Sequence, residues 1–546
     1  MQRPVVQRLA GRGSARGAVV RPRCAAPCAN APLRCAPRAQ PQPRQQQQPQ
    51  RSRQQQQQHA QGAQQQHARR APRARTVAAA AAVEAPAAEQ LAALGQLQAW
   101  LSSAHAMPAP LLEPKRFKAP GGGAGERVGL IASRDVAAEA PLLVVPESAA
   151  ITSIDAEQHP LIGEAAKSCS ELVALALWLL AERATVAAGG SSAYGPLLAA
   201  LPAATQSPIL WDDRERAELL RGSPVLEEAR SRQAALQQQW AQLSQATVAA
   251  DPARFDPAHF NEAAFLRAFS VVLAHAAYLP SAECFALLPL AGQLGRTGNE
   301  NGADLDYDAA TGSVVLKSAR PYREGQEVLI NDGRPNGELL LCFGEVQDSN
   351  LADCLTFNAS LIAADKYYQS KEQLLTAMGM SISERFPVYA DRFPIQLLAY
   401  LRLTRIQDPG LFAKVSFDSD MVVSQMNEYE VLQLLMGECR ERLAEYKGSL
   451  EEEIKTLQNP DLQGRGRLAA RLRKSEKTIL TQFMDAVRRK LAPVRGIPTK
   501  SGGMQDPNAD FKEIFDTIEA IPTAPARLFD GIRRWARGDF DPEWKK

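Results

Sequence analysis

Cysteine and histidine are the residues of this chain with the widest range of chemistry, but their spacing forms no site. Five of the eight cysteines lie beyond the first 83 residues, and none of them is paired in spacing with another: Cys169, Cys284, Cys342, Cys354 and Cys439. The six histidines are equally scattered. Structural zinc sites need closely spaced Cys or His ligands, and disulfide frameworks need an ordered, even set. The sequence therefore predicts isolated thiols, with no metal site.

The first 83 residues carry a positive charge that the rest of the chain does not share. From Met1 to Val83 there are fifteen Arg and no Lys, Asp or Glu, and glutamine runs such as Gln54–Gln58 cannot bury apolar surface. An Arg-rich, acid-free N-terminus is typical of an organelle transit peptide, so we expect residues 1–83 to be a disordered transit region. The alternative is a disordered tail that carries no targeting signal.

Beyond residue 83 the balance of charge is acidic. The remaining 48 Lys and Arg face 60 Asp and Glu, a net charge of −12, which disfavours direct nucleic-acid binding. The longest strongly apolar stretch, Leu172–Ala181, is too short to span a bilayer, so the sequence predicts no transmembrane segment.

Hydrophobic periodicity divides the central part of the chain into a helix and a β-domain. Residues 84–124 hold one amphipathic helix within Ala85–Leu112 and then a Gly-rich linker. Residues 125–347 read as a β-domain, because short β-branched runs with turns stand at both of its ends. Helical patterns between these runs predict a helical insert at about residues 155–262. The strand-like and helical segments are Val128–Ala132, Leu142–Val145, Ser170–Ala184, Leu226–Leu243, Val314–Leu316 and Val328–Ile330.

The chain beyond Asp348 reads as almost wholly helical. Residues 348–498 contain two apolar stripes that we interpret as packing seams: Val431, Leu434, Leu435, Cys439, Leu443, Tyr446 and Leu450, and then Ile479, Leu480, Phe483, Met484, Val487 and Leu491. The tail 499–546 ends in an Arg-ringed apolar face of Leu528, Phe529, Ile532 and Trp535. Docking on a partner, on an anionic membrane surface and on its own domain are all open for this tail. The predicted fold class is α+β.

Three groups of segments resemble the plant Rubisco large-subunit methyltransferase family. Glu126–Asp135 (ERVGLIASRD) and Val144–Ser148 (VVPES) resemble the opening strands of its SET domain. Its closing half is similar to three runs: Leu305–Asp308 (LDYD), Arg320–Ile330 (RPYREGQEVLI) and Asn336–Gly344 (NGELLLCFG). Phe386–Tyr400 and Lys474–Leu480 resemble the family's helical substrate-binding domain. The resemblance covers roughly residues 90–495, and it implies a SET domain with a helical insert followed by an all-α substrate-binding domain.

The resemblance also implies a chemistry. Family enzymes transfer a methyl group from S-adenosylmethionine to a lysine amine, which must lose its proton first, since its ordinary pKa is about 10.4. The family's cofactor-binding positions correspond here to Arg127, Val128, Gly129, His275, Gly295 and Arg296, and its two channel tyrosines correspond to Asp332 and Phe343.

Most of these positions carry a residue other than the family's. Arg127 replaces a glycine, His275 an arginine, Gly295-Arg296 an Asn-His pair, and Asp332 and Phe343 the two tyrosines. A carboxylate beside the incoming amine favours its charged form and opposes transfer. An ion pair between Arg296 and Asp332 that fills the site is one interpretation; a ligand-binding role is the other. Nearby Asn299 or Asn301 replacing the lost Asn, or Asp332 acting as a base, also stays open.

Two functional hypotheses follow. In the first, the chain is a catalytically impaired SET protein of the chloroplast stroma that needs no cofactor and binds a plastid protein through its helical domain. In the second, it is an active protein-lysine N-methyltransferase that uses S-adenosylmethionine on a stromal protein such as the Rubisco large subunit or aldolase. The segment Asn336–Leu340, which keeps the family pattern, favours the second.

Overall fold

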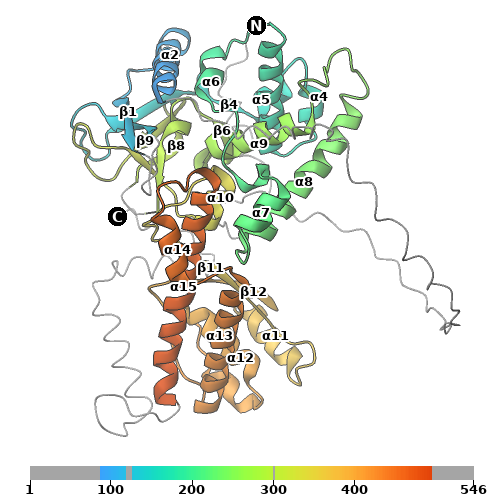
Figure 1. Cartoon of the computed structure of the whole chain (residues 1–546), viewed down its shortest axis with the longest axis vertical. Helices are drawn as coiled ribbons and strands as arrows, with labels where there is room; N and C mark the ends of the chain where they lie inside the picture. Colours follow the sequence, from blue (N-terminus) through green and yellow to red (C-terminus); the bar gives the residue numbers. More distant parts are fainter. Residues whose placement is uncertain (1–86, 119–125, 299–301, 495–546) are drawn as a thin grey trace, which may run out of the picture. The chain divides into compact units, whose positions relative to one another are not determined.

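The computed structural model describes residues 87–118, 126–298 and 302–494, coloured in Figure 1. The transit region, the Gly-rich linker, the loop with Asn299 and Asn301, and the C-terminal tail lie outside these ranges, apart from a few residues at their edges. None of the described helices is long and apolar enough to cross a membrane. Within the described ranges the five cysteines are free thiols, and no cluster of His, Cys, Asp and Glu suits a metal ion.

The β-domain consists of four small sheets in the N-terminal half of the described chain. Antiparallel pairing joins the strands of three sheets, and parallel pairing joins those of the fourth. The sheets are β1 (Leu112–Lys118) with β2 (Glu126–Ala132); β3 (Pro141–Pro146) with β9 (Ser313–Lys317) and β8 (Asp304–Asp308); β4 (Ile151–Thr152) with β6 (Cys284–Leu287) and β5 (Ala276–Leu279); and β7 (Gly295–Thr297) with β10 (Leu329–Asn331).

Helices precede this domain and interrupt it, as the periodicity predicts. The first is α2 (Ala87–His105), which buries Leu94, Leu97 and Leu101. The helical insert is longer than predicted, because its last helix continues to His275. The helices between the strands are α3 (Ser153–Glu157), α4 (Gly163–Ala166), α5 (Glu171–Ala187), α6 (Gly195–Ala200), α7 (Asp213–Leu219), α8 (Val225–Ala246) and α9 (Glu262–His275), and α10 (Asn336–Phe343) closes the domain.

Helix α5 is the centre of this half of the molecule. Every residue from Leu172 to Ala181 is buried, because an all-round apolar helix is stable only when other elements surround it. Helix α9 packs along α5, and its N-terminus is capped by the side chain of Asn261, which accepts the N–H of Ala264. Helix α5 contributes to both of the cavities described below, and α9 contributes to the second.

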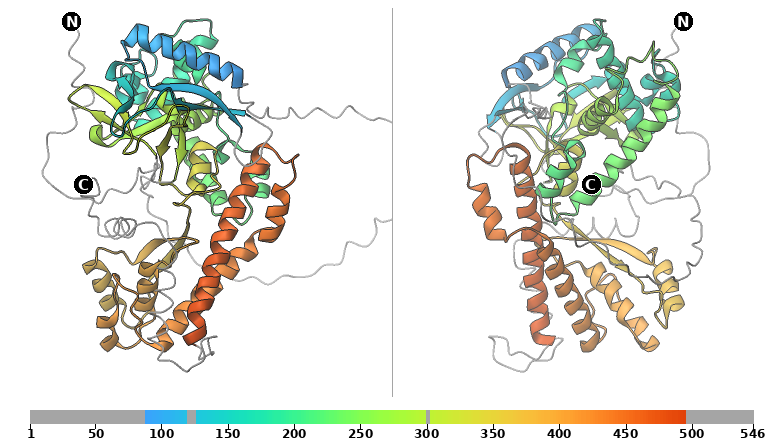
Figure 2. Two further views of the ribbon diagram at one scale, coloured as in Figure 1. Left: turned by 90° about the vertical axis from the view of Figure 1, so that its left-hand side faces the viewer. Right: turned by 45° about the vertical axis from the view of Figure 1, so that its right-hand side comes forward.

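The C-terminal region is helical, with one addition that the sequence analysis did not predict. Strands β11 (Leu355–Ser360) and β12 (Ser383–Val388) form an antiparallel pair at its start, so the Phe386–Tyr400 segment is half strand and half helix. Its helices are α11 (Tyr368–Ala377), α12 (Ile395–Arg405), α13 (Gln425–Glu445), α14 (Leu450–Leu457) and α15 (Gly464–Val494). Figure 2 shows α14 running beside α15.

The two predicted apolar stripes differ in how completely they are buried. The six residues of the second stripe are all buried on α15 and join one core with α12, α13 and the β11–β12 pair. The first stripe is only partly right: Val431, Leu435 and Cys439 are buried on α13, but Leu434 is exposed. Leu450 belongs to the next helix, since the chain leaves α13 at Tyr446.

A separate small core connects the insert to the C-terminal region. Trp211, Leu220 and Val225 of the insert pack with Leu340 of α10 and Leu472 of α15. Polar contacts follow the same path: Ser223 donates a hydrogen bond to Glu476 over 2.7 Å, and Arg465 pairs with Glu215 at 2.7 Å. Helix α15 is therefore part of both cores.

Candidate functional site

The predicted site residues lie on strands β2 and β7, directly after strand β10, and on helices α9 and α10. The parallel pairing of β7 with β10 sets Gly295 opposite Leu329 and Arg296 opposite Ile330. The N–H of Asp332 then donates to the carbonyl of Thr297 over 2.8 Å, which continues the pairing. Residues from distant parts of the sequence are therefore neighbours because of strand register.

Arg296, Asp332 and Phe343 form a compact group. Arg296 Nε lies 3.4 Å from Asp332 Oδ2, and the two side chains are 13% and 10% exposed. The Arg296 guanidinium also lies 3.7 Å from the centre of the Phe343 ring and donates to the carbonyl of Ala274 over 2.8 Å. Burial lowers the pKa of Arg296, although nearby Glu345 and Asp332 oppose that shift. The ion pair that was one of the two interpretations of these positions is present.

Arg334 adds a second cation to the same group. Its Nε lies 3.7 Å from the other oxygen of Asp332, and its guanidinium is 5.1 Å from the Phe343 ring centre. The backbone N–H of Arg334 also donates to Asp332 over 3.1 Å. One carboxylate thus lies between two guanidinium groups, which also share one aromatic ring. Cation–π attraction and the shared charge hold this arrangement together.

Arg127 does not join this group directly and forms a second ionic pair. Both of its terminal nitrogens donate to the carboxylate of Glu327, over 2.5 and 2.9 Å. This two-pronged hydrogen bond raises the pKa of Arg127, and the Phe117 ring lies 4.7 Å below its guanidinium. The pair covers Gly129: a Cβ atom added there would stand 2.6 Å from Glu327 Oε1 and 2.9 Å from Arg127 Nη1.

Among the remaining predicted positions, His275 supplies little positive charge. Its Nδ1–H donates to the carbonyl of Gly292 over 2.7 Å. Burial, followed by repulsion from Arg296 and Arg183, lowers the pKa of His275 to about 4, so the ring is neutral near pH 7. Val128 packs partly buried against the main core, and a Cβ atom on Gly295 would stand 2.7 Å from Leu329.

The C-terminal part of the chain matches a known family. Residues 363–480 match the family described as Rubisco LSMT substrate-binding. The fold agrees with that match: the structure of Rubisco LSMT bound to AdoMet superposes with a TM-score of 0.61 at 20% identity, over 81% of this chain and 99% of that one. The SET domain of LSMT bound to lysine and AdoHcy gives the same values. Residues 363–480 therefore form a domain of the Rubisco LSMT substrate-binding family, and the chain has the fold of the SET-domain protein Rubisco LSMT.

Proteins with three different activities are similar to this chain. The chloroplastic Rubisco large-subunit N-methyltransferase of Nicotiana tabacum is 22% identical over 66% of this chain and 76% of its own length. The chloroplastic aldolase-lysine N-methyltransferase of Arabidopsis thaliana is 23% identical over the same shares. The actin-histidine N-methyltransferase of Danio rerio is 26% identical over 67% of this chain and 64% of its own length. These relatives indicate an S-adenosylmethionine-dependent protein methyltransferase family.

The arrangement of the family positions does not fit S-adenosylmethionine well. Close approach of a ligand to backbone at Gly129 meets the Arg127–Glu327 pair, whose carboxylate also lies 3.6 Å from a Cβ position on Gly295. The neutral His275 lacks the fixed two-pronged donor set that suits a carboxylate. We therefore derive no methyl-transfer step from these side chains.

Sequence reasoning missed two members of the SET site. Glu327 and Arg334 lie inside or beside the family motifs, but no local pattern marks them as partners of residues on other strands. The only signal in the sequence for these partners is an acidic residue near each substituted arginine, and several acidic residues fit that description. Arg127 pairs with Glu327, and Arg296 pairs with Asp332.

The segment Asn336–Leu340 has a structural task in this chain. Asn336 is 1% exposed, and its side chain donates to the carbonyl of Gln347 over 3.0 Å and to Asp353 over 2.7 Å. Gln347 in turn donates from its side chain to the carbonyl of Arg296 over 3.1 Å. The segment therefore ties the end of the β-domain to the start of the C-terminal region.

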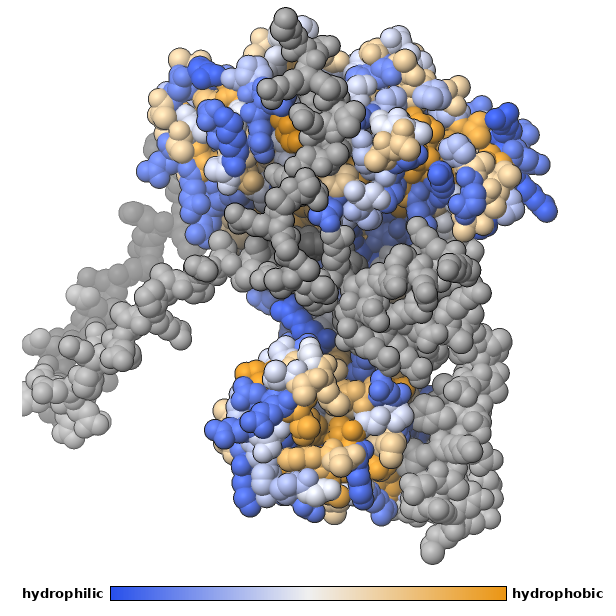
Figure 3. Space-filling view, turned by 180° about the vertical axis from the view of Figure 1, so that it is seen from behind, coloured by the Kyte–Doolittle hydropathy of each residue, from blue (hydrophilic) through white to orange (hydrophobic). Residues whose placement is uncertain are grey.

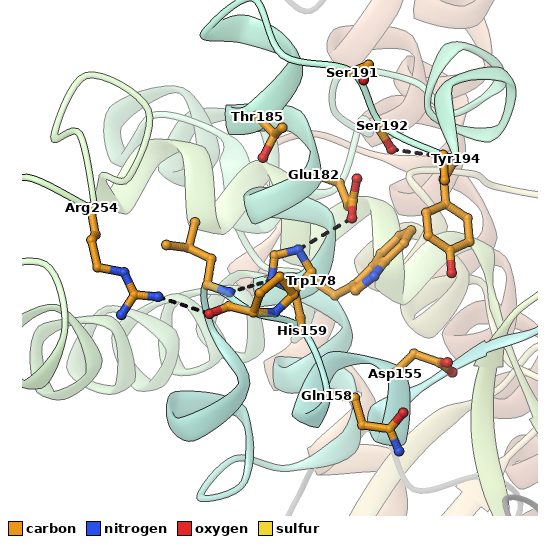
Figure 4. A pocket seen from close by; sticks show the side chains of 13 residues that line it. Asp155, Gln158, His159, Trp178, Glu182, Thr185, Ser191, Ser192, Tyr194 and Arg254 are labelled. Carbon is orange, nitrogen blue, oxygen red and sulfur yellow. Dashed lines mark hydrogen bonds and ion pairs between the residues drawn. The ribbon is translucent and has the colours of Figure 1, made fainter. Parts of the chain in front are cut away.

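A cavity of about 680 Å³ opens in the insert, away from the family positions. Figure 4 shows the His159 ring turned toward the Glu182 carboxylate in this cavity. The N–H of Leu161 donates to His159 Nδ1, so the proton of that ring is on Nε2, 3.4 Å from Glu182. Arg254 donates to the carbonyl of Pro160 over 2.9 Å. Because these groups satisfy each other, the cavity gives no sign of a particular ligand.

Proposed function

We propose that this SET-domain protein of the plastid stroma is impaired in methyl transfer and acts by binding another protein through its C-terminal region. The observation that carries the proposal is the position of Arg296. Its guanidinium lies against Phe343 and Asp332, the two positions that correspond to the family's channel tyrosines.

A cation at this place competes with the reaction in two ways. The incoming amine must be neutral and must reach the same small volume, but Arg296 keeps its charge at any physiological pH. Asp332 adds a carboxylate that favours the ammonium form of any amine that does enter. Loss of one preorganised polar group commonly costs about a hundredfold in rate, and here both tyrosine hydroxyls are replaced.

The Arg127–Glu327 pair supports the same proposal from the other side. It lies over Gly129, where a ligand would need access to backbone, and its hydrogen bonds are short and two-pronged. Opening it means separating two charges whose side chains are 36% and 18% exposed. Because the pair is partly solvated, this is a moderate barrier and not an absolute one.

The C-terminal region has a surface suited to protein binding. Figure 3 shows apolar side chains gathered on one face of it. Large apolar side chains are exposed at two places there: Ile362, Met378 and Ile382 near α11, and Met421, Met426 and Tyr429 at the start of α13. Flexible methionines adapt to irregular partner surfaces. Exposed apolar patches of this kind commonly mark interaction sites.

Titration calorimetry of the full chain with S-adenosylmethionine tests the impaired site. We expect no binding in the micromolar range for the natural sequence. A variant with Arg127→Gly, Gly295→Asn, Arg296→His and Asp332→Tyr restores four of the six substituted family residues and should gain binding, whereas Arg296→Lys, which keeps the cation, should not. Micromolar binding by the natural sequence would contradict the proposal.

An active protein-lysine methyltransferase is the second candidate, and the fold and the relatives favour it. Incubating the full chain with methyl-labelled cofactor and stromal extract distinguishes the two. Labelled protein that disappears when Asp332 is replaced by Ala would establish activity in this site. The histidine-specific relatives make it useful to identify the labelled residue, since a histidine acceptor would leave the SET site active but the lysine assignment wrong.

A further inference from the structure

A second cavity of about 400 Å³ lies in the insert between α5 and α9. Nine of its twelve lining residues are leucine or alanine, and α6 and the loop that follows it complete the wall. The apolar lining includes Leu180, Ala184, Leu198, Leu201, Ala264 and Ala268. None of the residues at the family's cofactor and lysine positions lines it, so a ligand bound in this cavity would be independent of methyl transfer.

Two arginines line this apolar cavity without a carboxylate partner among the described residues. Arg183 of α5 donates only to backbone, over 2.6 Å to the carbonyl of Pro202 and 3.2 Å to that of Ala203. These two bonds use two of its five N–H donors. Arg267 of α9 is exposed and forms no ion pair within the described chain. The cavity therefore has unused donors at one place on its wall.

The two cations disfavour one another. Burial, followed by repulsion from Arg267, lowers the pKa of Arg183 to about 10. Arg183 also acts on the buried ring of His275 and lowers its pKa further. Neither Asp256 nor Glu262 pairs with these arginines: Asp256 lies 3.9 Å from His259, a lining residue, and Glu262 accepts from Gln237. The uncompensated positive charge favours an anion at this wall.

The cavity beside it provides a contrast on the same helix. Glu182 precedes Arg183 on α5, and successive helix residues point about 100° apart, so the two side chains enter different cavities. In the first cavity Glu182 is matched by His159, and in the second Arg183 is matched by backbone carbonyls only. Only the second cavity lacks an internal counter-charge within the described residues.

We propose that this second cavity binds a small amphiphilic anion, a carboxylate that carries a short apolar chain. The carboxylate lies between Arg183 and Arg267, whose planar guanidinium groups suit carboxylate geometry. The chain lies along the leucine and alanine wall of α5, α6 and α9. The cavity of about 400 Å³ has the volume of about a dozen water molecules at about 30 Å³ each, which is room enough for a carboxylate with a chain of about eight carbons.

Calorimetric titration of the full chain with sodium octanoate tests this site. Acetate supplies the charge without the chain, and 1-heptanol supplies the chain without the charge. We expect saturable binding of one octanoate at least about tenfold tighter than either, since each of these two ligands lacks either the charge-assisted hydrogen bonds or the apolar contact. Absence of saturable octanoate binding, or equal binding of 1-heptanol, overturns the proposal.

Charge-reversal variants locate the binding. Arg267→Glu should weaken octanoate binding about tenfold or more without loss of fold, because the side chain is exposed and makes no described hydrogen bond. Arg221→Glu is the matched control, since Arg221 is another exposed arginine of the insert outside the cavity. Equal affinity in the natural chain and Arg267→Glu, or an equal loss in Arg221→Glu, refutes the site.

Discussion

The guanidinium of Arg296 lies 3.7 Å from the centre of the Phe343 ring, and this contact joins strand β7 to helix α10. Asp332 forms an ion pair with the same guanidinium. Arg296 therefore makes a cation–π interaction and an ion pair at once, and both of the paired side chains are mostly buried. Four predictions test how such contacts stabilise this chain and how they respond to pH.

A double-mutant cycle measures the coupling between Arg296 and Phe343. Arg296→Met and Phe343→Leu each remove one side of the contact and keep comparable apolar volume. We expect a coupling free energy of about 1 kcal/mol in urea unfolding, because a desolvated cation–π pair is worth about 0.5–2 kcal/mol. A coupling below about 0.3 kcal/mol would mean that the two side chains are only near each other.

The stability of the fold should fall as pH rises from about 5 to 8 because of Glu476. Its carboxyl is 4% exposed, and burial raises its pKa from 4.5 to about 8. Above pH 4.5 the unfolded chain releases this proton while the folded chain keeps it, so each further pH unit favours unfolding until about pH 8. The total effect is up to about 5 kcal/mol at about 1.4 kcal/mol for each pKa unit.

Urea unfolding at several pH values checks this, with Glu476→Gln as the variant. The groups around the carboxyl are Ser223, Tyr446, Asp353 and Arg473, and the variant leaves all four in place. The slope of stability against pH should flatten in Glu476→Gln and stay unchanged in Glu218→Gln, a substitution at an exposed position of α7. Parallel slopes in all three proteins would assign the pH dependence to other groups.

Two glycines with the same backbone conformation separate strain from steric overlap. Gly222 has φ +84°, and a Cβ atom there would stand 2.6 Å from the backbone N and Cα of Tyr446, where the insert meets the C-terminal region. Gly189 has φ +83° and open space around it. Gly189→Ala should cost about 1–2 kcal/mol from the left-handed backbone alone, and Gly222→Ala about 3 kcal/mol or more. Equal losses in denaturant unfolding would show that the contact with Tyr446 is not tight.

The C-terminal region depends on a buried ionic cluster. Arg402 is 1% exposed and donates to Glu428 over 2.6 and 2.8 Å and to Asp420 over 2.5 Å. Arg402→Met leaves both acids buried without it and should cost about 3–5 kcal/mol. Lys167→Ala, in an exposed pair with Glu164, should change stability by less than about 0.5 kcal/mol.

A second substitution identifies the cause of the loss in that cluster. If the cost of Arg402→Met comes from an unpaired buried charge, adding Glu428→Leu should recover part of it, since apolar side chains can replace a buried ion pair. Thermal or urea unfolding measures both variants. A double variant less stable than Arg402→Met would mean that Glu428 has a separate role in the core.

The elements of this fold were largely predictable because each depends on nearby residues. Apolar residues at helical spacing predicted α2, α5 and α8, and β-branched runs predicted β2, β3 and β9 within a few residues. The β11–β12 pair was missed, because its strands alternate buried and exposed residues over only six positions inside a strongly helical region. Short strands of this kind depend on their pairing partner and not on local preference.

The sequence by itself determined the SET type of fold, the order of its elements and the substitutions at the family positions. Only the tertiary structure decided which charges meet. Arg127 pairs with Glu327 across 200 residues, and Arg296 meets Asp332 because β7 and β10 run parallel in one register. The physical reason is that helical and strand periodicity are local properties of the chain, whereas an ion pair depends on the register between distant strands, which no short stretch of sequence contains.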